Sequence, residues 1–184
     1  MSPSSLTALI AERELLKNPG SHIIYNLICS RAVPEAIEEA GGKPLRSRVG
    51  HSYIKKMMAE NNAIFGGEHS GHFYFRDFWC ADSGMLAALH AIAALLDIQK
   101  PLSELLGRFN RFSLSGEINT KVDDQKLAIS RIKDHFGSGS TPVEFDELDG
   151  LTVTAEEWAL NVRPSNTEPL LRLNVEGITP EVMG

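Results

Sequence analysis

The sequence has little cysteine: Cys29 and Cys80 are the only two in 184 residues, and they lie far apart in apolar or aromatic surroundings. Two such cysteines support neither a disulfide framework nor a four-cysteine zinc site. Unpaired cysteines are typical of a reducing compartment, so the sequence predicts a cytoplasmic protein.

Long apolar runs and an excess of positive charge are also missing. The longest weakly polar run, residues 87–96, contains His90 and is too short to span a bilayer, and no signal-like segment opens the chain. Lysine and arginine number 18 against 24 aspartate and glutamate, a net charge of −6 that disfavours nucleic acid and membranes as partners. With 42% apolar residues and ordinary glycine and proline content, the composition is that of a folded globular protein.

The first part of the chain alternates helix and strand. Helical spacing follows Ser4 and Ser5, which can cap a helix. Short apolar runs at residues 22–28 and 63–65 are typical of strands, and residues 43–49 are predicted as a further strand between them. Helices are predicted between these strands, at 31–40 and from His51, and after them at 82–96 and 101–108. This order predicts an α/β domain with a parallel sheet, whose site is built by loops at the carboxyl ends of strands.

The second part has a different pattern. A strand at 116–122 and an amphipathic helix at 123–136 precede a Gly-Ser loop and candidate strands at 142–147, 151–155, 158–162 and 169–175. The pattern predicts a small α+β domain of helix and antiparallel sheet. We place the boundary near residues 108–113, which gives domains of residues 1–110 and 111–184.

One segment that carries chemistry is Gly66-Gly67-Glu68-His69-Ser70-Gly71-His72, directly after a predicted strand. Its glycines would let the backbone approach a ligand, and Glu68, Ser70 and His72 suit the neighbouring hydroxyls of a sugar. A site that pairs each hydroxyl rejects analogues that lack one. Two other interpretations stay open: a polar turn with surface histidines, and a metal site of Glu68, His69 and His72.

The other segment is Arg163-Pro164-Ser165-Asn166-Thr167-Glu168-Pro169. An arginine fork, hydroxyls, an amide and exposed backbone N–H groups can surround a phosphate. The alternative is a surface turn in which Arg163 pairs with Glu168. His51 is a candidate proton shuttle or phosphate donor at a helix start, and of the adjacent Lys55 and Lys56 at most one is expected to reach a ligand.

Together, GGEHSGH and RPSNTEP resemble the sugar-binding loop of domain three and the phosphate-binding loop of domain four in the α-D-phosphohexomutases. The resemblance extends through IIYNLICSR, VGHSYIKKMM and FYFRDFW and covers nearly the whole chain. RPSNTEP is similar to the phosphoglucomutase and phosphomannomutase branch, whereas phosphoglucosamine mutases typically carry RPSGTEP. The resemblance implies that Glu68 and Ser70, with neighbouring His72, contact the sugar. It also implies that the non-transferred phosphate is held by Arg163, Ser165, Asn166 and Thr167. His51 would lie near the reacting phosphate.

The sequence departs from the family pattern at two positions and lacks two loops. Ile28 stands where some members have a lysine, and His69 stands where methionine or glutamine is common. Family catalysis uses a phosphoserine in a TASHN-like loop and a metal in a DGDGDR-like loop, and neither sequence occurs here. The resemblance implies the carboxyl-terminal part of a mutase of hexose phosphates, inactive alone, with Mg²⁺ held by the missing N-terminal domains and no metal ligands in this chain. Alternatives are a stand-alone sugar-phosphate-binding module and part of a phosphoglucosamine mutase.

Overall fold

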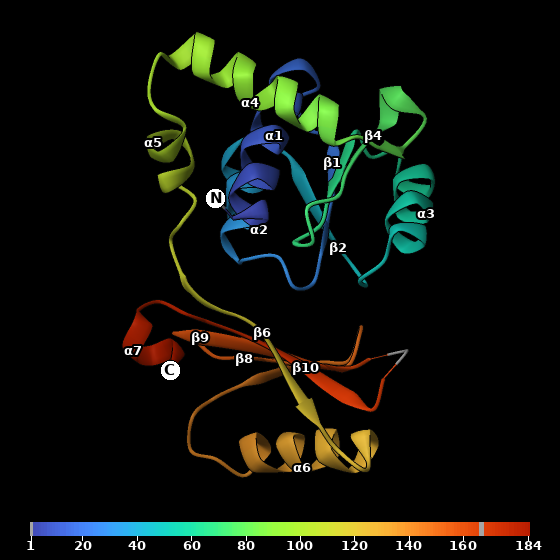
Figure 1. Cartoon of the computed structure of the whole chain (residues 1–184), viewed down its shortest axis with the longest axis vertical. Coiled ribbons are helices and arrows are strands. Elements are labelled where there is room, and N and C mark those ends of the chain that lie inside the picture. The colour runs from blue at the N-terminus through green and yellow to red at the C-terminus, as the bar shows by residue number, and fades with distance from the viewer. Residues whose placement is uncertain (1, 166–167) are drawn as a thin grey trace. The chain divides into compact units, whose positions relative to one another are not determined.

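The computed structural model describes residues 2–165 and 168–184, which form two compact units, Met1–Arg111 and Phe112–Gly184. The units divide between residues 111 and 112, within the range 108–113 in which the sequence places the boundary. The first unit combines helices with a mixed five-stranded sheet, and the second combines one long helix with an antiparallel five-stranded sheet (Figure 1). The predicted fold class, α/β followed by α+β, is confirmed.

The sheet of the first unit has the strand order β2-β1-β3-β4-β5. Strands β1, β2 and β3 are parallel, as predicted, but β4 and β5 are antiparallel additions. The reason is the short turn after β3, which reverses the chain because it contains no crossover helix. The strands are β1 (His22–Asn26), β2 (Lys43–Ser47), β3 (Phe65–Gly67), β4 (Phe73–Phe75) and β5 (Ala81–Asp82).

Helices cover both faces of this sheet. The larger core lies on one face, where α1, α2, α4 and α5 pack against Ile23, Phe65, Phe73 and Phe75, and α3 covers the other face through Ile54 and Met58. Figure 1 shows α3 apart from α1 and α2, across the sheet. The helices are α1 (Pro3–Lys17), α2 (Ala32–Glu39), α3 (His51–Asn61), the 3-10 helix η1 (Arg76–Phe78), α4 (Gly84–Ile98) and α5 (Leu102–Gly107).

The N-cap of helix α1 lies two or three residues before the predicted caps, Ser4 and Ser5. Ser2 is the N-cap residue and Pro3 occupies the first turn, which its fixed φ favours. Ser4 and Ser5 therefore lie inside the helix, where both are buried and bond other segments: Ser5 Oγ donates to Asn110 Oδ1 (2.7 Å), and Ser4 Oγ lies 2.9 Å from His69 Nδ1. The serines thus tie the start of α1 to two loops instead of capping it.

The glycines at β3 make room for helices. A Cβ at Gly67 would lie 2.4 Å from Thr7 Cγ2 on α1, and a Cβ at Gly66 would lie 2.8 Å from Ile54 Cγ2 on α3. The sequence predicts that these glycines bring backbone close to a ligand, whereas here they allow close packing of a helix on each face of the strand. This explains why β3 contains two residues of low strand propensity.

We expect Gly67→Ala to lower the free energy of unfolding by about 2 kcal/mol, because the added methyl group overpacks the contact with Thr7. Urea unfolding measures the change. Gly84→Ala is the matched control, since Gly84 opens α4 and its Cβ would have no atom within 4 Å. Equal stability of the two variants would contradict this account of β3.

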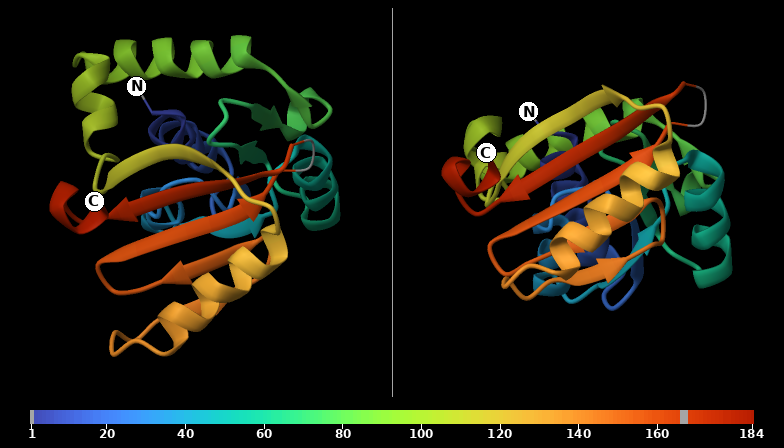
Figure 2. Two further views of the ribbon diagram at one scale, coloured as in Figure 1. Left: turned by 60° about the horizontal axis from the view of Figure 1, so that its bottom comes forward. Right: turned by 90° about the horizontal axis from the view of Figure 1, so that it is seen from below.

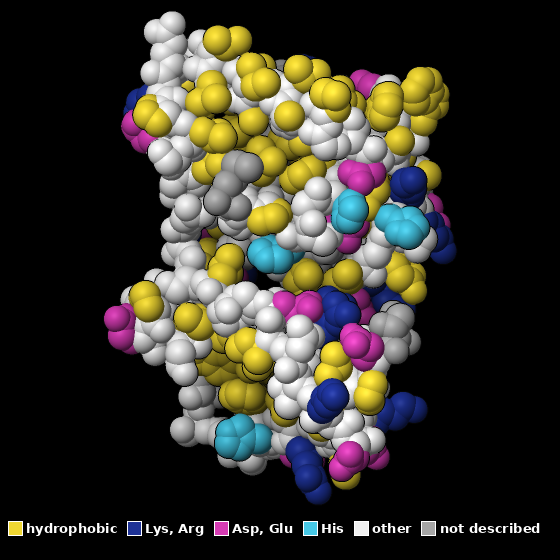
Figure 3. Space-filling model, in the orientation of Figure 1, with side chains coloured by type: hydrophobic (Ala, Val, Ile, Leu, Met, Phe, Trp, Pro, Cys, Tyr) yellow, Lys and Arg dark blue, Asp and Glu magenta, His cyan; other side chains and the backbone are white. Residues whose placement is uncertain are grey.

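Helix α4 packs through its small residues. Ala87 and Ala94 are buried, and Leu86, Ala91 and Leu95 also pack against the core. Met85, Leu89, Ile92 and Leu96, which are spaced one helical turn apart in the sequence, lie on the opposite, exposed face, with Met85 74% and Leu96 71% exposed. Figure 3 shows apolar side chains exposed along α4. Because α4 is apolar on all sides, its periodicity alone did not identify the packed face.

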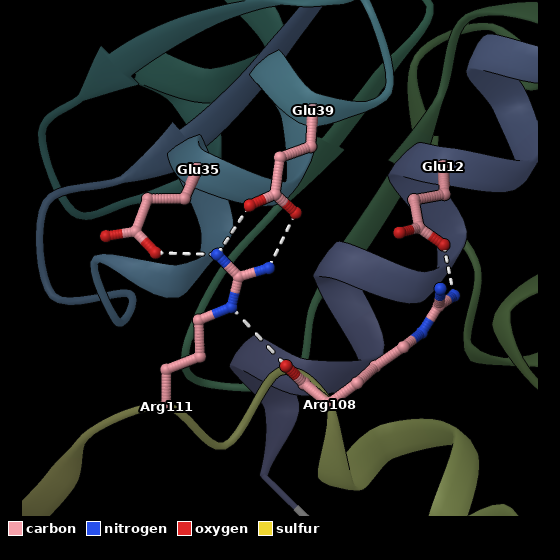
Figure 4. Close-up of polar contacts among 5 residues, drawn as sticks. All are labelled: Glu12, Glu35, Glu39, Arg108 and Arg111. Carbon is pink, nitrogen blue, oxygen red and sulfur yellow. Dashed lines mark hydrogen bonds and ion pairs between the residues drawn. The ribbon is translucent and has the colours of Figure 1, made fainter.

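The last residues of the first unit are tied to its helices by ion pairs (Figure 4). Arg111 forms a two-pronged contact with Glu39 (2.7 and 2.6 Å) and bonds Glu35 (2.9 Å), while Arg108 pairs with Glu12 on α1. The bonds from Arg111 lower the pKa of the Glu39 carboxyl, and burial raises the pKa of Glu12. Although exposed ion pairs contribute little singly, a bidentate arginine fixes geometry, so residues 108–111 have a defined path on α1 and α2.

The second unit is a sheet of order β6-β10-β9-β8-β7 with α6 across one face (Figure 2). Ile129, Ile132 and Phe136 of α6 pack against buried residues of the sheet, as the amphipathic pattern predicts. Asp124 caps this helix by accepting from the Leu127 N–H (2.9 Å). The elements are β6 (Ser113–Lys121), α6 (Gln125–Gly137), β7 (Glu144–Asp146), β8 (Leu151–Thr154), β9 (Trp158–Pro164), β10 (Leu170–Gly177) and a short α7 (Pro180–Met183) that the sequence did not predict.

Among the described residues, no helix is both long enough and apolar enough to cross a bilayer.

Candidate functional site

The first unit contains a cavity of about 370 Å³ at the carboxyl end of β3. It brings together four residues that the sequence singles out: His51, Glu68, Ser70 and His72. The first opens α3 and the other three follow β3, so elements far apart in the sequence supply one site. The cavity thus lies at a carboxyl end of the parallel strands, where the α/β pattern predicts it.

Glu68 is held in place by three donors. The Tyr74 hydroxyl donates to Oε1 (2.6 Å), and Asn26 Nδ2 (3.2 Å) and the Gly50 N–H (3.3 Å) donate to Oε2. Glu68 is 2% exposed, so its carboxylate depends on these partners in place of water. A carboxylate has about four acceptor positions, and one of them is left for a ligand.

The loop around Glu68 is a tight turn between β3 and β4. The Glu68 N–H donates to the His72 carbonyl (2.9 Å), and the Gly71 N–H donates to the Glu68 carbonyl (3.0 Å). Gly71 has φ +87°, a conformation that glycine adopts at little cost. The polar-turn interpretation is thus correct for the backbone, but it does not account for the buried carboxylate that the turn directs into the cavity.

His72 forms a pair with Asp82. Its Nδ1 lies 2.6 Å from Asp82 Oδ2, and Asp82 Oδ1 accepts from the Phe73 N–H (2.8 Å). Because the carboxylate can only accept, Nδ1 carries the proton, and in the neutral ring Nε2 is an acceptor. His72 and Asp82 both line the cavity, so this pair orients an imidazole there.

The start of α3 contributes a histidine and a lysine to the cavity. His51 is exposed at the first helical position, and Lys55, one turn later, also lines the cavity. Lys56 does not line the cavity and lies 3.8 Å from Glu60, which agrees with the expectation that at most one of the two adjacent lysines reaches a ligand. Gly50 precedes the helix with φ +128°, which directs its N–H to Glu68 while the chain enters α3.

The metal interpretation of the loop finds no support in residues 2–165 and 168–184, where no group of three histidine, cysteine or acidic residues is placed to hold an ion. The three candidate ligands have separate partners. Glu68 accepts from Tyr74 and Asn26, His69 lies against Ser4, and His72 pairs with Asp82. The described residues therefore do not fit a metal ion.

Cys29 and Ile28 lie beyond β1, close in sequence to the site. The Cys29 Sγ–H donates to Asn26 Oδ1 (3.1 Å), and burial raises the pKa of this thiol to about 12. Cys29 is therefore an uncharged packing residue, and both cysteines are free. Ile28 is half-buried and is not among the residues that line the cavity.

In the second unit, Arg163 and Arg172 share one acidic partner. They are direct neighbours across β9 and β10, and Glu117 on β6 accepts from Arg163 Nη2 (3.0 Å) and Arg172 Nη1 (3.2 Å). Both Nε atoms are buried and have no hydrogen-bond partner in the described part of the chain. Two guanidinium groups and one carboxylate leave one net positive charge and unused donors, which suits an anion.

Arg163 therefore pairs with Glu117 on a strand, and no bond to Glu168 is found among the described side chains. Ser165 follows β9, is buried, and donates its N–H to the Leu170 carbonyl (2.8 Å). Asn166 and Thr167 lie outside the described residues. Arg163 and Ser165 thus stand at the start of the turn that the sequence assigns to phosphate.

Four further residues contribute to these sites although no sequence motif assigned them a role: Asn26, Tyr74, Asp82 and Glu117. Asn26 ends an otherwise apolar strand, which is a usable signal for a site residue. Tyr74 stands between two phenylalanines, so its sequence context indicates a packing residue. Asp82 lies beside His72, and Glu117 beside Arg163, only because the strands pair.

Comparison with known proteins decides the family. Residues 2–112 match "Phosphoglucomutase/phosphomannomutase, alpha/beta/alpha domain III", and residues 117–183 match the C-terminal domain of the same family. The chain belongs to the phosphoglucomutase/phosphomannomutase family. Its two units are therefore domains III and IV, as the two sequence motifs predict.

Several relatives that the chain matches are named phosphomannomutases. The chain is 44% identical over 178 residues to one from Methanocaldococcus jannaschii, covering 97% of this chain and 39% of that protein. It is 42% identical to one from Escherichia coli K12, covering 93% of this chain and 37% of the relative. The chain thus spans about two fifths of the length of these phosphomannomutases.

Solved structures show the same fold. A phosphoglucomutase/phosphomannomutase family protein from Burkholderia thailandensis aligns with a TM-score of 0.83 at 28% identity, covering 100% of this chain and 39% of that one. An Aspergillus fumigatus N-acetylphosphoglucosamine mutase in complex with glucose 1,6-bisphosphate aligns with a TM-score of 0.66 at 12% identity, a likeness of fold alone.

Proposed function

We propose that the chain is the substrate-recognition part of a phosphomannomutase/phosphoglucomutase that interconverts hexose 1-phosphate and hexose 6-phosphate through a bisphosphate intermediate. The observation that carries the proposal is the cavity of the first unit, where the Glu68 carboxylate, the Ser70 hydroxyl and the His72–Asp82 pair meet. Acceptors and hydroxyl groups at fixed positions are what a sugar with several hydroxyls requires.

Glu68 accepts from one sugar hydroxyl in this proposal. Three of its acceptor positions are occupied by Tyr74, Asn26 and Gly50, so neighbouring hydroxyls are left to Ser70 and His72. Equatorial hydroxyls present similar positions in two orientations of a hexose. One set of contacts therefore serves both the 1-phosphate and the 6-phosphate substrate.

The phosphate that does not react is held by Arg163, Ser165, Asn166 and Thr167. Support comes from the unused donors of the Arg163 and Arg172 guanidinium groups, which a phosphate can satisfy. His51 has an auxiliary role beside the reacting phosphate, where Lys55 adds a positive charge. Local positive charge of this kind attracts a phosphate in spite of the net charge of −6.

Phosphoryl transfer is assigned to parts of a mutase outside this sequence. The TASHN-like and DGDGDR-like loops of the family are absent from it, so this chain alone is expected to have no mutase turnover. Mg²⁺ in the whole enzyme would stabilise charge on the transferring phosphate and would be held by those other domains. The partners of this chain are then hexose phosphates and the remaining mutase domains, in the cytoplasm.

We expect the chain to bind glucose 1-phosphate and mannose 1-phosphate weakly, with a Kd on the order of 1 mM, because it offers a few hydrogen bonds and part of a site. Titration followed by amide NMR should show shifts at residues 66–72. Glu68→Gln removes the charged acceptor and should weaken binding about tenfold. Glu60→Gln, on an exposed site of α3, removes the same charge and should bind as the unaltered chain does.

Shifts that are equally strong in Glu68→Gln would place the sugar elsewhere. No shift with either sugar phosphate at tens of millimolar would argue against the proposal for this chain.

A further inference from the structure

Glu68 is the meeting point of donors from three separate segments. Asn26 ends β1, Gly50 precedes α3, and Tyr74 lies on β4. Their contacts with the carboxylate are 3.2, 3.3 and 2.6 Å long. An exposed carboxylate could accept from a sugar hydroxyl without these three donors. Their presence around Glu68 therefore indicates a further role.

The Tyr74 hydroxyl is a hydrogen-bond donor to Glu68. Tyr74 is 1% exposed, and burial together with the neighbouring Glu68 carboxylate raises the pKa of its hydroxyl, so the proton stays on the phenol oxygen. The opposite side of β4 carries Phe73 and Phe75, which pack in the main core and fix the strand. The hydroxyl therefore has a fixed position from which it holds Oε1.

The amide of Asn26 is oriented by its other contacts. Its Oδ1 accepts from the Cys29 Sγ–H (3.1 Å) and from the His69 N–H (3.3 Å), so that atom must be the oxygen. Nδ2 is then the atom directed to Glu68 Oε2. Asn26 is fully buried, which leaves its amide no water to turn toward.

We propose that Tyr74 and Asn26 are positioning residues that hold the Glu68 carboxylate in one orientation and thereby set how strictly the site selects for a sugar hydroxyl. The inference rests on the proposed function. With both oxygens fixed, the Glu68 carboxylate has one acceptor position left. A ligand that lacks a hydroxyl at that point leaves this acceptor without a hydrogen bond. A carboxylate released from Tyr74 could rotate to other donors, so the missing hydroxyl would cost less.

The test compares glucose 1-phosphate with its three ring-hydroxyl monodeoxy analogues. The unaltered chain should bind at least one analogue about tenfold more weakly than glucose 1-phosphate, which identifies the hydroxyl on Glu68. Tyr74→Phe removes one oxygen and keeps the ring. It should weaken binding of glucose 1-phosphate and reduce that penalty to about twofold, with amide NMR and urea unfolding to show that the fold is retained.

Tyr53→Phe is the matched control, because Tyr53 is exposed on α3 and does not line the cavity. It should leave both the affinity and the penalty unchanged. Asn26→Asp is a second variant of similar size, which puts a carboxylate against Glu68 and should also reduce the penalty.

The outcomes separate the inference from the proposed function. A folded Tyr74→Phe chain that keeps the full penalty, or that loses affinity equally for all four ligands, would overturn the positioning role, since equal loss is what a merely structural residue produces. If the unaltered chain binds none of the ligands, or binds all four equally, the proposed sugar contact of Glu68 fails and the positioning role fails with it.

Discussion

Replacing Gly150 with alanine is expected to destabilise the unit Phe112–Gly184 by about 3 kcal/mol or more, the largest effect of any single methyl group considered for this chain. Gly150 precedes β8 with φ +71°, and a Cβ there would lie 2.3 Å from the Val162 carbonyl oxygen and 2.7 Å from Arg163 Cα. These are backbone atoms of the central strand β9, which cannot turn aside as a side chain can. Left-handed strain adds to the overlap.

Gly116 supplies the control for Gly150. Its φ of +70° is nearly the same, but a Cβ there would meet no atom within 4 Å. Gly116→Ala should therefore show the backbone strain alone, about 1 kcal/mol. Urea unfolding with amide NMR as the readout follows each unit separately, and residues 2–111 should keep their native shifts in both variants. Similar losses in the two variants would show that the contact with β9 relaxes and that the overlap is unimportant.

Arg163→Ala is expected to weaken binding of glucose 1-phosphate and mannose 1-phosphate by about tenfold to a hundredfold, the range of a lost hydrogen bond to a charged group. The guanidinium pair with Glu117 carries one net positive charge, and removal of Arg163 leaves Arg172 neutralised by the same carboxylate. Both the donors and the charge for a phosphate are then lost. NMR titration gives the affinity directly.

Two further variants isolate the cause. Arg131→Ala removes an equal charge from an exposed position on α6 and should leave the affinity unchanged. Arg163→Lys keeps the charge but lacks the planar fork, so it should restore a minor part of the affinity if two-pronged donation matters. Unaltered binding by Arg163→Ala would remove the turn after β9 from the phosphate site.

The order of helices and strands could be predicted because local patterns specify it. The parallel order of β1, β2 and β3 follows from the alternation of apolar runs and amphipathic helices, and the packing of α6 follows from Ile129, Ile132 and Phe136. Local patterns failed where two faces were equally apolar or where a short turn replaced a helix. The exposed face of α4 and the antiparallel strands β4 and β5 are these cases.

The candidate site could be predicted in four of its cavity-lining residues but not in the residues that support them. His51, Glu68, Ser70 and His72 were recognisable because polar residues follow predicted strands or open predicted helices, and the structure brings them to one cavity. Tyr74, Asn26 and Glu117 support Glu68 and Arg163 from other strands. Strand register decides such pairs, and no spacing along the chain encodes it.

The sequence by itself determined the family, the two domains and the polar residues of the two motifs, because these depend on composition and on motifs contiguous in the chain. Only the tertiary structure decided that the glycines of β3 admit Thr7 and Ile54, that Glu68 is buried under three donors, and that Arg163 and Arg172 share Glu117. These features depend on distances between segments far apart in sequence, which exist only after the sheets have formed and the helices have packed on them.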